Sequence, residues 1–270
     1  MRPMRVRDTG ITVAATVIVV PCYNEATRLN AEAMAAGMAA LEDVSILFVD
    51  DGSTDSTHRI LEDLCRADPG SFSLLRLERN AGKAEAVRAG VNEALGAGAE
   101  FVGYWDADLA TPLDQIGVFR SILVDRPELV AVLGSRVRRL GSNIERNQSR
   151  HLLGRLFATA ASLVLGLPVY DTQCGAKLFR AVPAVKSSFA EPFLSRWLFD
   201  VELLARLVRN LDRDVTTRRV MSLYEQPLPV WRDEPGSKLS LGHKLKVPVE
   251  LFAIYRRYRD RDLPGPKKFS

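Results

Sequence analysis

The sequence predicts an α/β fold built on a mostly parallel sheet with helices on both faces. Short apolar runs rich in Val, Ile, Leu and Phe alternate with stretches of helical periodicity through the first half of the chain. The 270 residues, 47% of them hydrophobic, can also supply one sizeable core. No Gly-x-Gly-x-x-Gly pattern follows any of the apolar runs, which argues against a dinucleotide-binding oxidoreductase.

The first half contains five predicted strands and four predicted helices. The strands are 16–20, 44–49, 73–77, 101–105 and 129–133. The helices are 31–41, 55–66, 83–95 and a fourth that opens at Thr111-Pro112-Leu113-Asp114. Ser53 or Thr54 is a candidate cap for the second helix. In the fourth helix Thr111 is the expected N-cap and Pro112 the first helical residue.

The second half is less regular. A basic loop, 136–150, leads into a predicted helix over 151–165. The polar segment 170–179 is a loop or a strand, and 197–211 is a strong helix. A strand over 215–223 is followed by a loop over 225–239 and by a last helix over 242–259. The tail, 262–270, contains two Pro and one Gly and is expected to be loose.

Charge is unevenly distributed along the chain. The net charge is +4, yet segments 136–155 and 232–268 each sum to +5, which leaves −6 for the remainder. An acidic body with two basic segments suggests an anionic partner, although a solvated surface would give the same pattern. The basic residues match no nucleic-acid-binding motif, so no nucleic-acid partner is expected.

The cysteines and the hydropathy of the chain indicate the cellular compartment to expect. The three cysteines are odd in number, and their spacings do not suit metal ligation, as in a reduced cytosolic protein. The basic start leads into only a short apolar stretch, and no run reaches the ~18–20 uncharged residues that span a bilayer. The sequence thus predicts neither a signal peptide nor a transmembrane span. A cytoplasmic protein, peripheral on the membrane face at most, is expected.

Two carboxylates close the strand 101–105. Asp106 and Asp108 are one residue apart at its carboxyl end, where ligands bind in open α/β sheets. Two carboxylates at this spacing repel each other unless a cation joins them, and Mg²⁺ or Mn²⁺ with oxygen ligands serves this purpose and also binds phosphate. Capping of the following helix is the structural alternative.

Polar motifs end four consecutive strands. They are Pro21-Cys-Tyr-Asn-Glu25, Asp50-Asp-Gly-Ser-Thr-Asp55, Asn80-Ala-Gly-Lys83 and Asp106-Ala-Asp108. Each alone is compatible with simple turn chemistry. In parallel strands, however, all four meet at one edge of the sheet, which indicates a common binding site for a nucleotide or a phosphoryl group.

The four motifs together resemble glycosyltransferase family 2, whose fold is the nucleotide-sugar-binding GT-A fold. The resemblance implies a catalytic domain over 15–240, preceded by a lead over 1–14 and followed by an amphipathic helix and tail over 241–270. It implies that Asp106 and Asp108 bind Mg²⁺ or Mn²⁺ on the donor diphosphate. The implied donor-nucleotide residues are Pro21, Tyr23, Glu25, Asp50, Asp51, Lys83, Asp106 and Ala107.

Four downstream segments sharpen the resemblance. Gly134-Ser-Arg136, Asp171-Thr-Gln-Cys-Gly-Ala-Lys177, Arg196-Trp-Leu-Phe-Asp-Val-Glu202 and Gly236-Ser-Lys238 look like dolichyl-phosphate β-glucosyltransferases and, more loosely, dolichyl-phosphate mannose synthases. The implied reaction is inverting transfer of glucose or a related hexose from a UDP-sugar, favoured over a GDP-sugar, to a polyprenyl phosphate. The implied acceptor-phosphate residues are Arg136, Arg150, Arg232 and Lys238, and the implied catalytic residues are Asp171, Arg136 and Arg232.

The chain departs from these families at two places. Mannose synthases carry a metal-binding Gln two residues after the second Asp, where this chain has Ala110, as the glucosyltransferases do. The eukaryotic glucosyltransferases carry an N-terminal membrane helix, which this sequence does not contain. A soluble sugar or metabolite acceptor is therefore an alternative, and a non-catalytic nucleotide-sugar-binding protein is a third reading that the intact acidic pair disfavours.

Several residues admit two roles on sequence grounds. Asp171 is either a general base or a group that orients an Arg. Asp200 and Glu202 do not share one helix face, so either could face the site or form a structural ion pair. Cys174 reads as a packed residue rather than a nucleophile, and Trp231 either stacks on a ligand or packs. The helix 242–259 interleaves apolar residues with Lys and Arg, so it either contacts an anionic membrane surface or packs on the catalytic domain or a partner subunit.

Overall fold

A computed structural model of the chain describes residues 5–6, 12–145, 161–162, 165, 167–211, 222–232 and 241–258. The strands are β1 (Arg5–Val6), β2 (Thr12–Val13), β3 (Thr16–Cys22), β4 (Val44–Asp50), β5 (Phe72–Arg76), β6 (Phe101–Trp105), β7 (Ala131–Ser135), β8 (Asn143–Glu145), β9 (Ala176–Arg180), β10 (Leu223–Pro227) and β11 (Val230–Arg232). The helices are α1 (Ala31–Met38), α2 (Thr57–Ala67), α3 (Lys83–Ala97), α4 (Asp114–Asp125), α6 (Pro183–Ala190), α7 (Phe199–Leu211) and α8 (Leu241–Tyr258).

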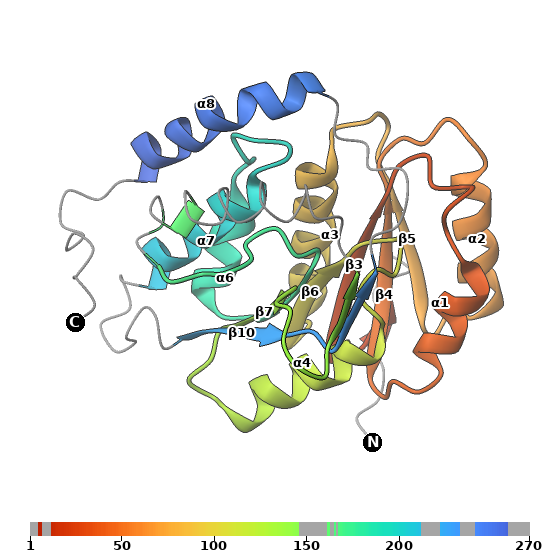
Figure 1. The fold of residues 1–270 in the computed structure, drawn as a ribbon. Coiled ribbons are helices and arrows are strands. Elements are labelled where there is room, and N and C mark those ends of the chain that lie inside the picture. Colours follow the sequence, from red (N-terminus) through yellow and green to blue (C-terminus); the bar gives the residue numbers. More distant parts are fainter. Residues whose placement is uncertain are drawn as a thin grey trace.

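A seven-stranded sheet forms the centre of the molecule (Figure 1). Its strand order is β10-β7-β9-β6-β3-β4-β5. Strand β9 pairs antiparallel with both of its neighbours, β6 and β7, and the other pairings in this sheet are parallel. The prediction of a mostly parallel α/β sheet is confirmed.

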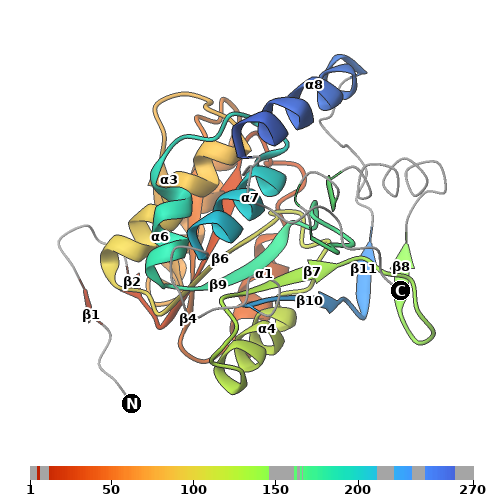
Figure 2. The same ribbon diagram turned by 90° about the vertical axis from the view of Figure 1, so that its left-hand side faces the viewer.

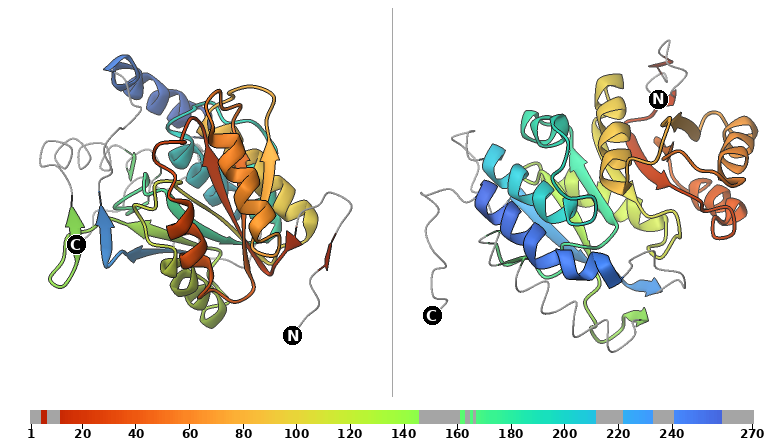
Figure 3. Two further views of the ribbon diagram at one scale, coloured as in Figure 1. Left: turned by 90° about the vertical axis from the view of Figure 1, so that its right-hand side faces the viewer. Right: turned by 90° about the horizontal axis from the view of Figure 1, so that it is seen from above.

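The central strands are buried on both faces, which explains their near-continuous apolar sequences. In β3, Val17 and Val19 belong to the core cluster that includes α3, α6 and α7, whereas Ile18 and Val20 belong to the cluster that includes α1, α2 and α4. Helices α1 and α2 (red and orange) lie at the opposite side of the molecule from α8 (blue), as Figure 3 shows. The predicted cover of helices on both faces is confirmed.

Two small sheets flank the main one. Strands β1 and β2 pair antiparallel, and β8 pairs in parallel with β11 (Figure 2). The N–H of Arg232 in β11 donates to the carbonyl of Ala110 at 3.3 Å. The β8–β11 pair is thereby joined to the segment that carries the acidic pair.

Predictions for the second half were less accurate. The predicted strand 215–223 overlaps the observed β10 only at Leu223, and its residues 215–221 lie outside the described part. The predicted loop 225–239 is wrong where β10 and β11 form. Strand β10 is a half-buried edge strand in which Glu225 and Gln226 interrupt the apolar residues, so it has no continuous apolar run that would predict a strand. Helix α6 was not predicted, and α4 begins at Asp114 rather than after Thr111.

The C-terminal helix α8 packs on α7. Leu251 and Ile254 of α8 are buried. The Tyr258 hydroxyl donates to Glu202 Oε1 at 2.8 Å, and Glu202 also forms a buried ion pair with Arg206 at 2.7 Å. Glu202 thus has the structural role that the sequence left open. No helix among the described residues is both long and apolar enough to cross a bilayer.

A pair of glycines in α3 tests the packing of this helix on the sheet. A Cβ at Gly90 would lie 2.6 Å from Val19 Cγ1 and 2.8 Å from Val49 Cγ2, whereas a Cβ at Gly96 would meet nothing within 4 Å. Overpacking costs about 1–3 kcal/mol, and replacing a helical Gly with Ala gains up to ~1 kcal/mol. We expect Gly90→Ala to lower the free energy of unfolding in a urea titration and Gly96→Ala to raise it. Equal effects of the two substitutions would contradict this packing.

Candidate functional site

The four polar motifs gather at one edge of the sheet. Strands β3, β4, β5 and β6 run parallel to one another, so their carboxyl ends point the same way. Asp50 is the last residue of β4, and Asp106 directly follows β6. This is the edge where open α/β sheets bind ligands. The predicted convergence of the motifs is confirmed.

The first two motifs are bonded to each other. Ser53 Oγ accepts from the N–H of Asn24 at 3.1 Å, and Thr57 Oγ1 accepts from the N–H of Glu25 at 2.8 Å. Asn24 adopts a positive φ of 49°, which suits the tight turn after β3. This segment holds three of the predicted nucleoside-binding residues in half-buried positions, namely Pro21, Tyr23 and Glu25.

The carboxylates that end β4 are buried and bonded within the protein. Asp50 accepts from the N–H of Ser53 at 2.9 Å, and its other oxygen lies 3.1 Å from His58 Nδ1. Asp51 accepts from the N–H groups of Ala81 and Gly82 at 2.7 and 2.8 Å. Both aspartates therefore shape the loops of the site, and their contact with a nucleoside stays a prediction.

Each carboxylate of the acidic pair forms an ion pair with a basic side chain. Lys83 Nζ lies 2.5 Å from Asp106 Oδ1, and Arg28 Nη2 lies 3.2 Å from Asp108 Oδ2. Arg28 also contacts Glu25 at 3.4 Å. Burial, followed by the charge of Asp106, raises the pKa of Asp108. Burial opposes the charge on Lys83, but Asp106 and the other nearby carboxylates raise its pKa, so Lys83 stays protonated.

These contacts bear on whether the site suits a divalent cation. The two carboxylates attract cations strongly enough to hold an ammonium and a guanidinium. Within the described residues, no group of three or more His, Cys, Asp or Glu could hold a metal. Ala110, two residues after Asp108, is buried and has no side-chain ligand atom. Asp106 and Asp108 offer two oxygen ligands, which suits a hard cation whose remaining ligands are phosphate oxygens and water, and a metal bound to this pair stays a prediction.

Asp106 is positioned by a close backbone approach. Its N–H donates to the carbonyl of Gly175 at 3.0 Å, and a Cβ at Gly175 would lie only 1.9 Å from Asp106 Oδ2. Only glycine leaves room for the carboxylate there. The loop before β9 thus helps to set the geometry of the predicted metal site.

Asp171 and Arg136 form a bidentate ion pair. Arg136 Nε and Nη2 lie 2.6 and 2.7 Å from the two carboxylate oxygens of Asp171, and the Arg136 N–H also donates to Asp171 at 3.1 Å. Burial opposes the charge on Arg136, but Asp171 raises its pKa further above the ordinary value. The geometry favours an orienting role for Asp171 over that of a general base, because both of its oxygens are occupied by the guanidinium.

Other residues complete the surroundings of Arg136. Its guanidinium lies over the Trp231 ring at 5.1 Å from the ring centroid, which supports packing of that indole. Glu225 accepts from the N–H groups of Tyr170 and Asp171, both at 2.8 Å. Arg232 follows Trp231 and has an exposed side chain. Two predicted acceptor residues, Arg150 and Lys238, lie outside the described part of the chain.

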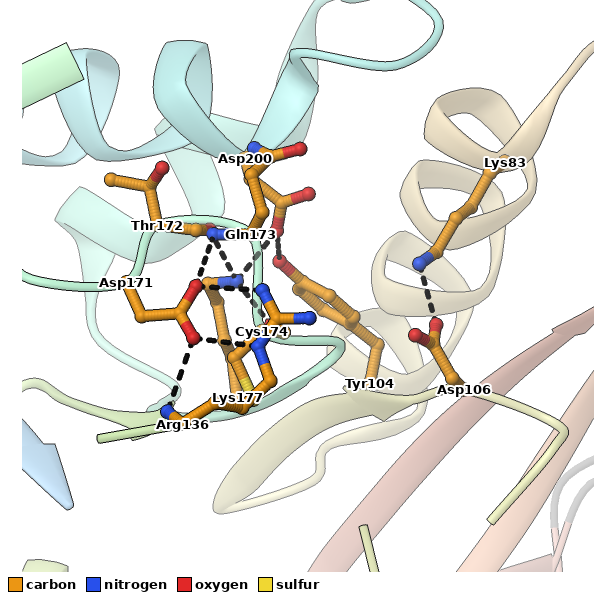
Figure 4. A network of polar contacts seen from close by, with 10 residues as sticks. All are labelled: Lys83, Tyr104, Asp106, Arg136, Asp171, Thr172, Gln173, Cys174, Lys177 and Asp200. Atoms are coloured by element: carbon orange, nitrogen blue, oxygen red, sulfur yellow. Dashed lines mark hydrogen bonds and ion pairs between the residues drawn. The ribbon is translucent and has the colours of Figure 1, made fainter. Parts of the chain in front are cut away.

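A buried polar network lies between these two parts of the site (Figure 4). Lys177, fully buried in β9, donates to Asp200 Oδ1 at 2.6 Å and to the carbonyls of Thr172 and Cys174 at 2.9 and 2.7 Å. Tyr104 of β6 donates to the same Asp200 oxygen. Burial raises the pKa of the Cys174 thiol to about 11, consistent with a packed residue rather than a nucleophile.

Two cations of this site, Arg28 and Lys177, had no role assigned from the sequence, although Lys177 ends one of the segments that carry the resemblance. Arg28 lies three residues after the first motif, and Lys177 lies inside an apolar strand, where a charged residue needs a partner. A lysine between Ala176 and Leu178 was the available signal for a buried ion pair. Its partner, Asp200, is distant in sequence and could not be assigned.

Gly175 provides a test of the metal-site geometry. Gly175→Ala should displace the Asp106 carboxylate and weaken Mn²⁺ binding in the presence of UDP by about 10- to 100-fold, the range for changes that reorient a metal ligand. Titration calorimetry measures this affinity. Gly117→Ala is the control, since its Cβ would meet only Leu41 Cδ2 at an ordinary 3.6 Å. Unchanged affinity in Gly175→Ala would show that the close approach does not position Asp106.

Comparison with solved structures agrees with the GT-A fold. Glucosyl-3-phosphoglycerate synthase from Mycobacterium tuberculosis, in complex with Mn²⁺, UDP and glucosyl-3-phosphoglycerate, superposes with a TM-score of 0.62 at 20% identity, covering 90% of this chain and 80% of that one. The mannosyltransferase PcManGT from Pyrobaculum calidifontis, in complex with GDP-Man and Mn²⁺, gives 0.59 at 19% identity, covering 98% and 70%. At these identities the likeness is one of fold.

Sequence comparison is more specific. The chain is 31% identical over 258 residues to the dolichyl-phosphate beta-glucosyltransferase ALG5C of Trichomonas vaginalis, covering 90% of this chain and 72% of the relative. It is 31% identical over 256 residues to the dolichyl-phosphate beta-glucosyltransferase of Dictyostelium discoideum, covering 89% and 74%. The model of glycosyl transferase family 2 matches residues 17–185. The chain is a glycosyltransferase and belongs to glycosyl transferase family 2.

Proposed function

We propose that this enzyme transfers a hexose, glucose by preference, from a UDP-sugar to a polyprenyl phosphate of the dolichyl type, with inversion at the anomeric carbon. The observation that carries the proposal is the charge-compensated acidic pair at the edge where four parallel strands end. The relatives named above are dolichyl-phosphate beta-glucosyltransferases, which supports glucose and a lipid phosphate as the two substrates.

On the donor side, Asp106 and Asp108 would hold Mg²⁺ or Mn²⁺ against the diphosphate. A bound divalent ion neutralises the diphosphate as the glycosidic bond breaks. Lys83 Nζ lies 2.5 Å from Asp106 and Arg28 Nη2 lies 3.2 Å from Asp108. Either basic side chain would exchange its carboxylate partner for an oxygen of the diphosphate. Pro21, Tyr23, Glu25, Asp50, Asp51 and Ala107 would surround the nucleoside and its diphosphate.

On the acceptor side, the nucleophile supplies its own charge. A phosphate monoester has a second pKa of ~6 and is largely dianionic at neutral pH. Its oxygen attacks the anomeric carbon, the bond from that carbon to the β-phosphate oxygen breaks, and UDP leaves with that oxygen without a proton transfer. Arg136, held by Asp171, would bind the acceptor phosphate together with Arg232, Arg150 and Lys238. Asp171 acts through Arg136 in this scheme.

The outer surface of α8 supports contact with a membrane. Val249 and Phe252 are 70% and 63% exposed, while Leu251 and Ile254 on the same helix are buried. Arg256 and Arg257 are exposed in the last turn. Apolar side chains beside arginines suit the interface of an anionic bilayer, where a polyprenyl phosphate is embedded.

A transfer assay tests the function directly. The enzyme is incubated with Mn²⁺, UDP-glucose or GDP-mannose, and either a short polyprenyl phosphate or 3-phosphoglycerate, and products are identified by mass. We expect glucosyl polyprenyl phosphate from UDP-glucose. Asp108→Ala should abolish it because one of the two carboxylates is lost.

Val124→Ala serves as the control for this assay, because Val124 lies on α4 and is 57% exposed. It should retain full activity. Sugar transfer to 3-phosphoglycerate alone would identify a small phosphorylated acceptor instead. Product that persists in Asp108→Ala would reject the role of the acidic pair.

The membrane contact gives a separate prediction. Replacing both Val249 and Phe252 with Ser should reduce partition onto anionic phosphatidylserine vesicles about tenfold, because two apolar side chains lose their burial in the interface. Vesicle sedimentation measures the bound fraction. The matched control is Val124→Ser on α4. Equal binding by the double variant and the control would place the contact elsewhere.

A further inference from the structure

The loop that carries Lys83 is held from two sides. From the end of β4, Asp51 accepts from the N–H groups of Ala81 and Gly82 at 2.7 and 2.8 Å. From the segment before α7, Arg196 donates to carbonyls of the same loop. One partner therefore binds the loop's donors and the other its acceptors.

The Arg196 guanidinium binds the loop through two of its nitrogens. Its Nε donates to the Ala81 carbonyl at 2.9 Å, and its Nη2 donates to the Asn80 carbonyl at 3.2 Å. The planar guanidinium presents donors in a fixed arrangement, so the two bonds also fix the direction of the loop. A lysine ammonium could not reproduce both bonds with the same geometry.

Gly82 makes this contact sterically possible. Its φ of +97° is one that L side chains rarely adopt, and a Cβ there would lie 2.8 Å from Arg196 Nε. The loop therefore passes directly beneath the guanidinium. The next residue, Lys83, begins α3, and its Nζ lies 2.5 Å from Asp106 Oδ1.

The backbone that carries Arg196 is itself anchored. Ser195 Oγ accepts from the N–H of Leu198 at 2.8 Å and donates to Glu250 of α8 at 2.5 Å. One residue earlier, the N–H of Leu194 donates to Glu202 Oε2 at 2.7 Å. Arg196 thus projects from a segment fixed to both α7 and α8, although its own side chain is largely exposed.

We infer that Arg196 is a positioning residue for the donor diphosphate. It holds the 80–82 loop so that Lys83 lies over Asp106, where the diphosphate of the proposed UDP-sugar would bind. We call the pair of contacts that Asp51 and Arg196 make with the 80–82 loop the clamp. The identity of the ligand rests on the proposed function, whereas the clamp rests on the contacts described above. The Arg196 guanidinium donates to the carbonyls of Asn80 and Ala81, so its effect on the ligand passes through the loop.

Arg196 also favours the charge state that the clamp requires. Burial raises the pKa of Asp51, while the N–H groups of Ala81 and Gly82 and then the Arg196 charge oppose that rise. An ionised Asp51 accepts both N–H bonds. The two sides of the clamp therefore support each other electrostatically as well as sterically.

The test compares Arg196→Met, Arg196→Lys and Arg120→Met with the wild type. Arg120 is a matched control because it donates to a backbone carbonyl, that of Glu42, at 2.7 Å and contacts Asp43 at 3.4 Å. Both partners directly precede β4, at the opposite end of that strand from the motif that begins at Asp50. Two measurements are made on the full chain: UDP affinity in the presence of Mn²⁺ by calorimetry, and amide hydrogen exchange of residues 81–83. KM values for UDP-glucose and for polyprenyl phosphate are then determined separately.

We expect Arg196→Met to weaken UDP binding about tenfold, the effect of losing hydrogen bonds from a charged donor. The KM for UDP-glucose should rise while that for the lipid phosphate stays constant, exchange at Ala81 and Gly82 should accelerate, and Arg196→Lys should restore part of the affinity. Arg120→Met should behave as wild type.

The inference is overturned if Arg196→Met binds UDP as tightly as Arg120→Met does, or if exchange at Ala81 and Gly82 does not change. A wild-type enzyme that binds no UDP would instead reject the proposed donor. In that case the amide exchange alone decides whether Arg196 clamps the loop.

Discussion

The architecture of the site depends on the ion pair and hydrogen bonds of the buried Lys177 ammonium. It is fully buried and bonded to Asp200 and to two carbonyls of the 171–175 loop, while Tyr104 donates to the same Asp200. Removing one partner of a buried ion pair typically costs about 3–5 kcal/mol because the other charge is left unpaired. The network therefore joins β6, the loop before β9 and α7 into one unit. That loop carries Asp171, which orients Arg136, and Gly175, which borders Asp106.

The edge of the sheet balances its charges before any ligand arrives. Asp106 and Asp108 would repel each other, and burial already raises the pKa of Asp108, yet Lys83 and Arg28 keep the pair compensated. The same cations have the sign that a diphosphate requires. Binding of a donor together with a divalent cation would then exchange ion pairs within the protein for ion pairs with the ligand, because the cation would compensate Asp106 and Asp108 while Lys83 and Arg28 turn to the diphosphate.

On the acceptor side, the ion pair of Arg136 and Asp171 leaves no free carboxylate oxygen to act as a base. The two oxygens of Asp171 are occupied by Arg136, and a phosphate acceptor is already ionised at neutral pH, so a strong base has no proton to remove. A sugar hydroxyl would need such a base. The ion pair of Arg136 and Asp171 is thus consistent with a phosphate nucleophile, in keeping with the exposed apolar and basic side chains of α8.

The sequence by itself determined the strands of the first half, their mostly parallel arrangement and the common edge of the four motifs. These features follow from local signals, namely apolar runs, helix periodicity and polar residues placed directly after strands. Only the tertiary structure decided that β9 enters antiparallel between β6 and β7, because strand pairing depends on contacts between distant segments. The same reason explains why the partners of Lys177, Arg28 and Arg196 could not be predicted. Lys177 and Arg28 also have local partners, but Lys177 pairs with Asp200, Arg28 with Asp108 and Arg196 with the carbonyl of Ala81 across 23, 80 and 115 residues, and contacts at such separations leave no trace in local sequence pattern.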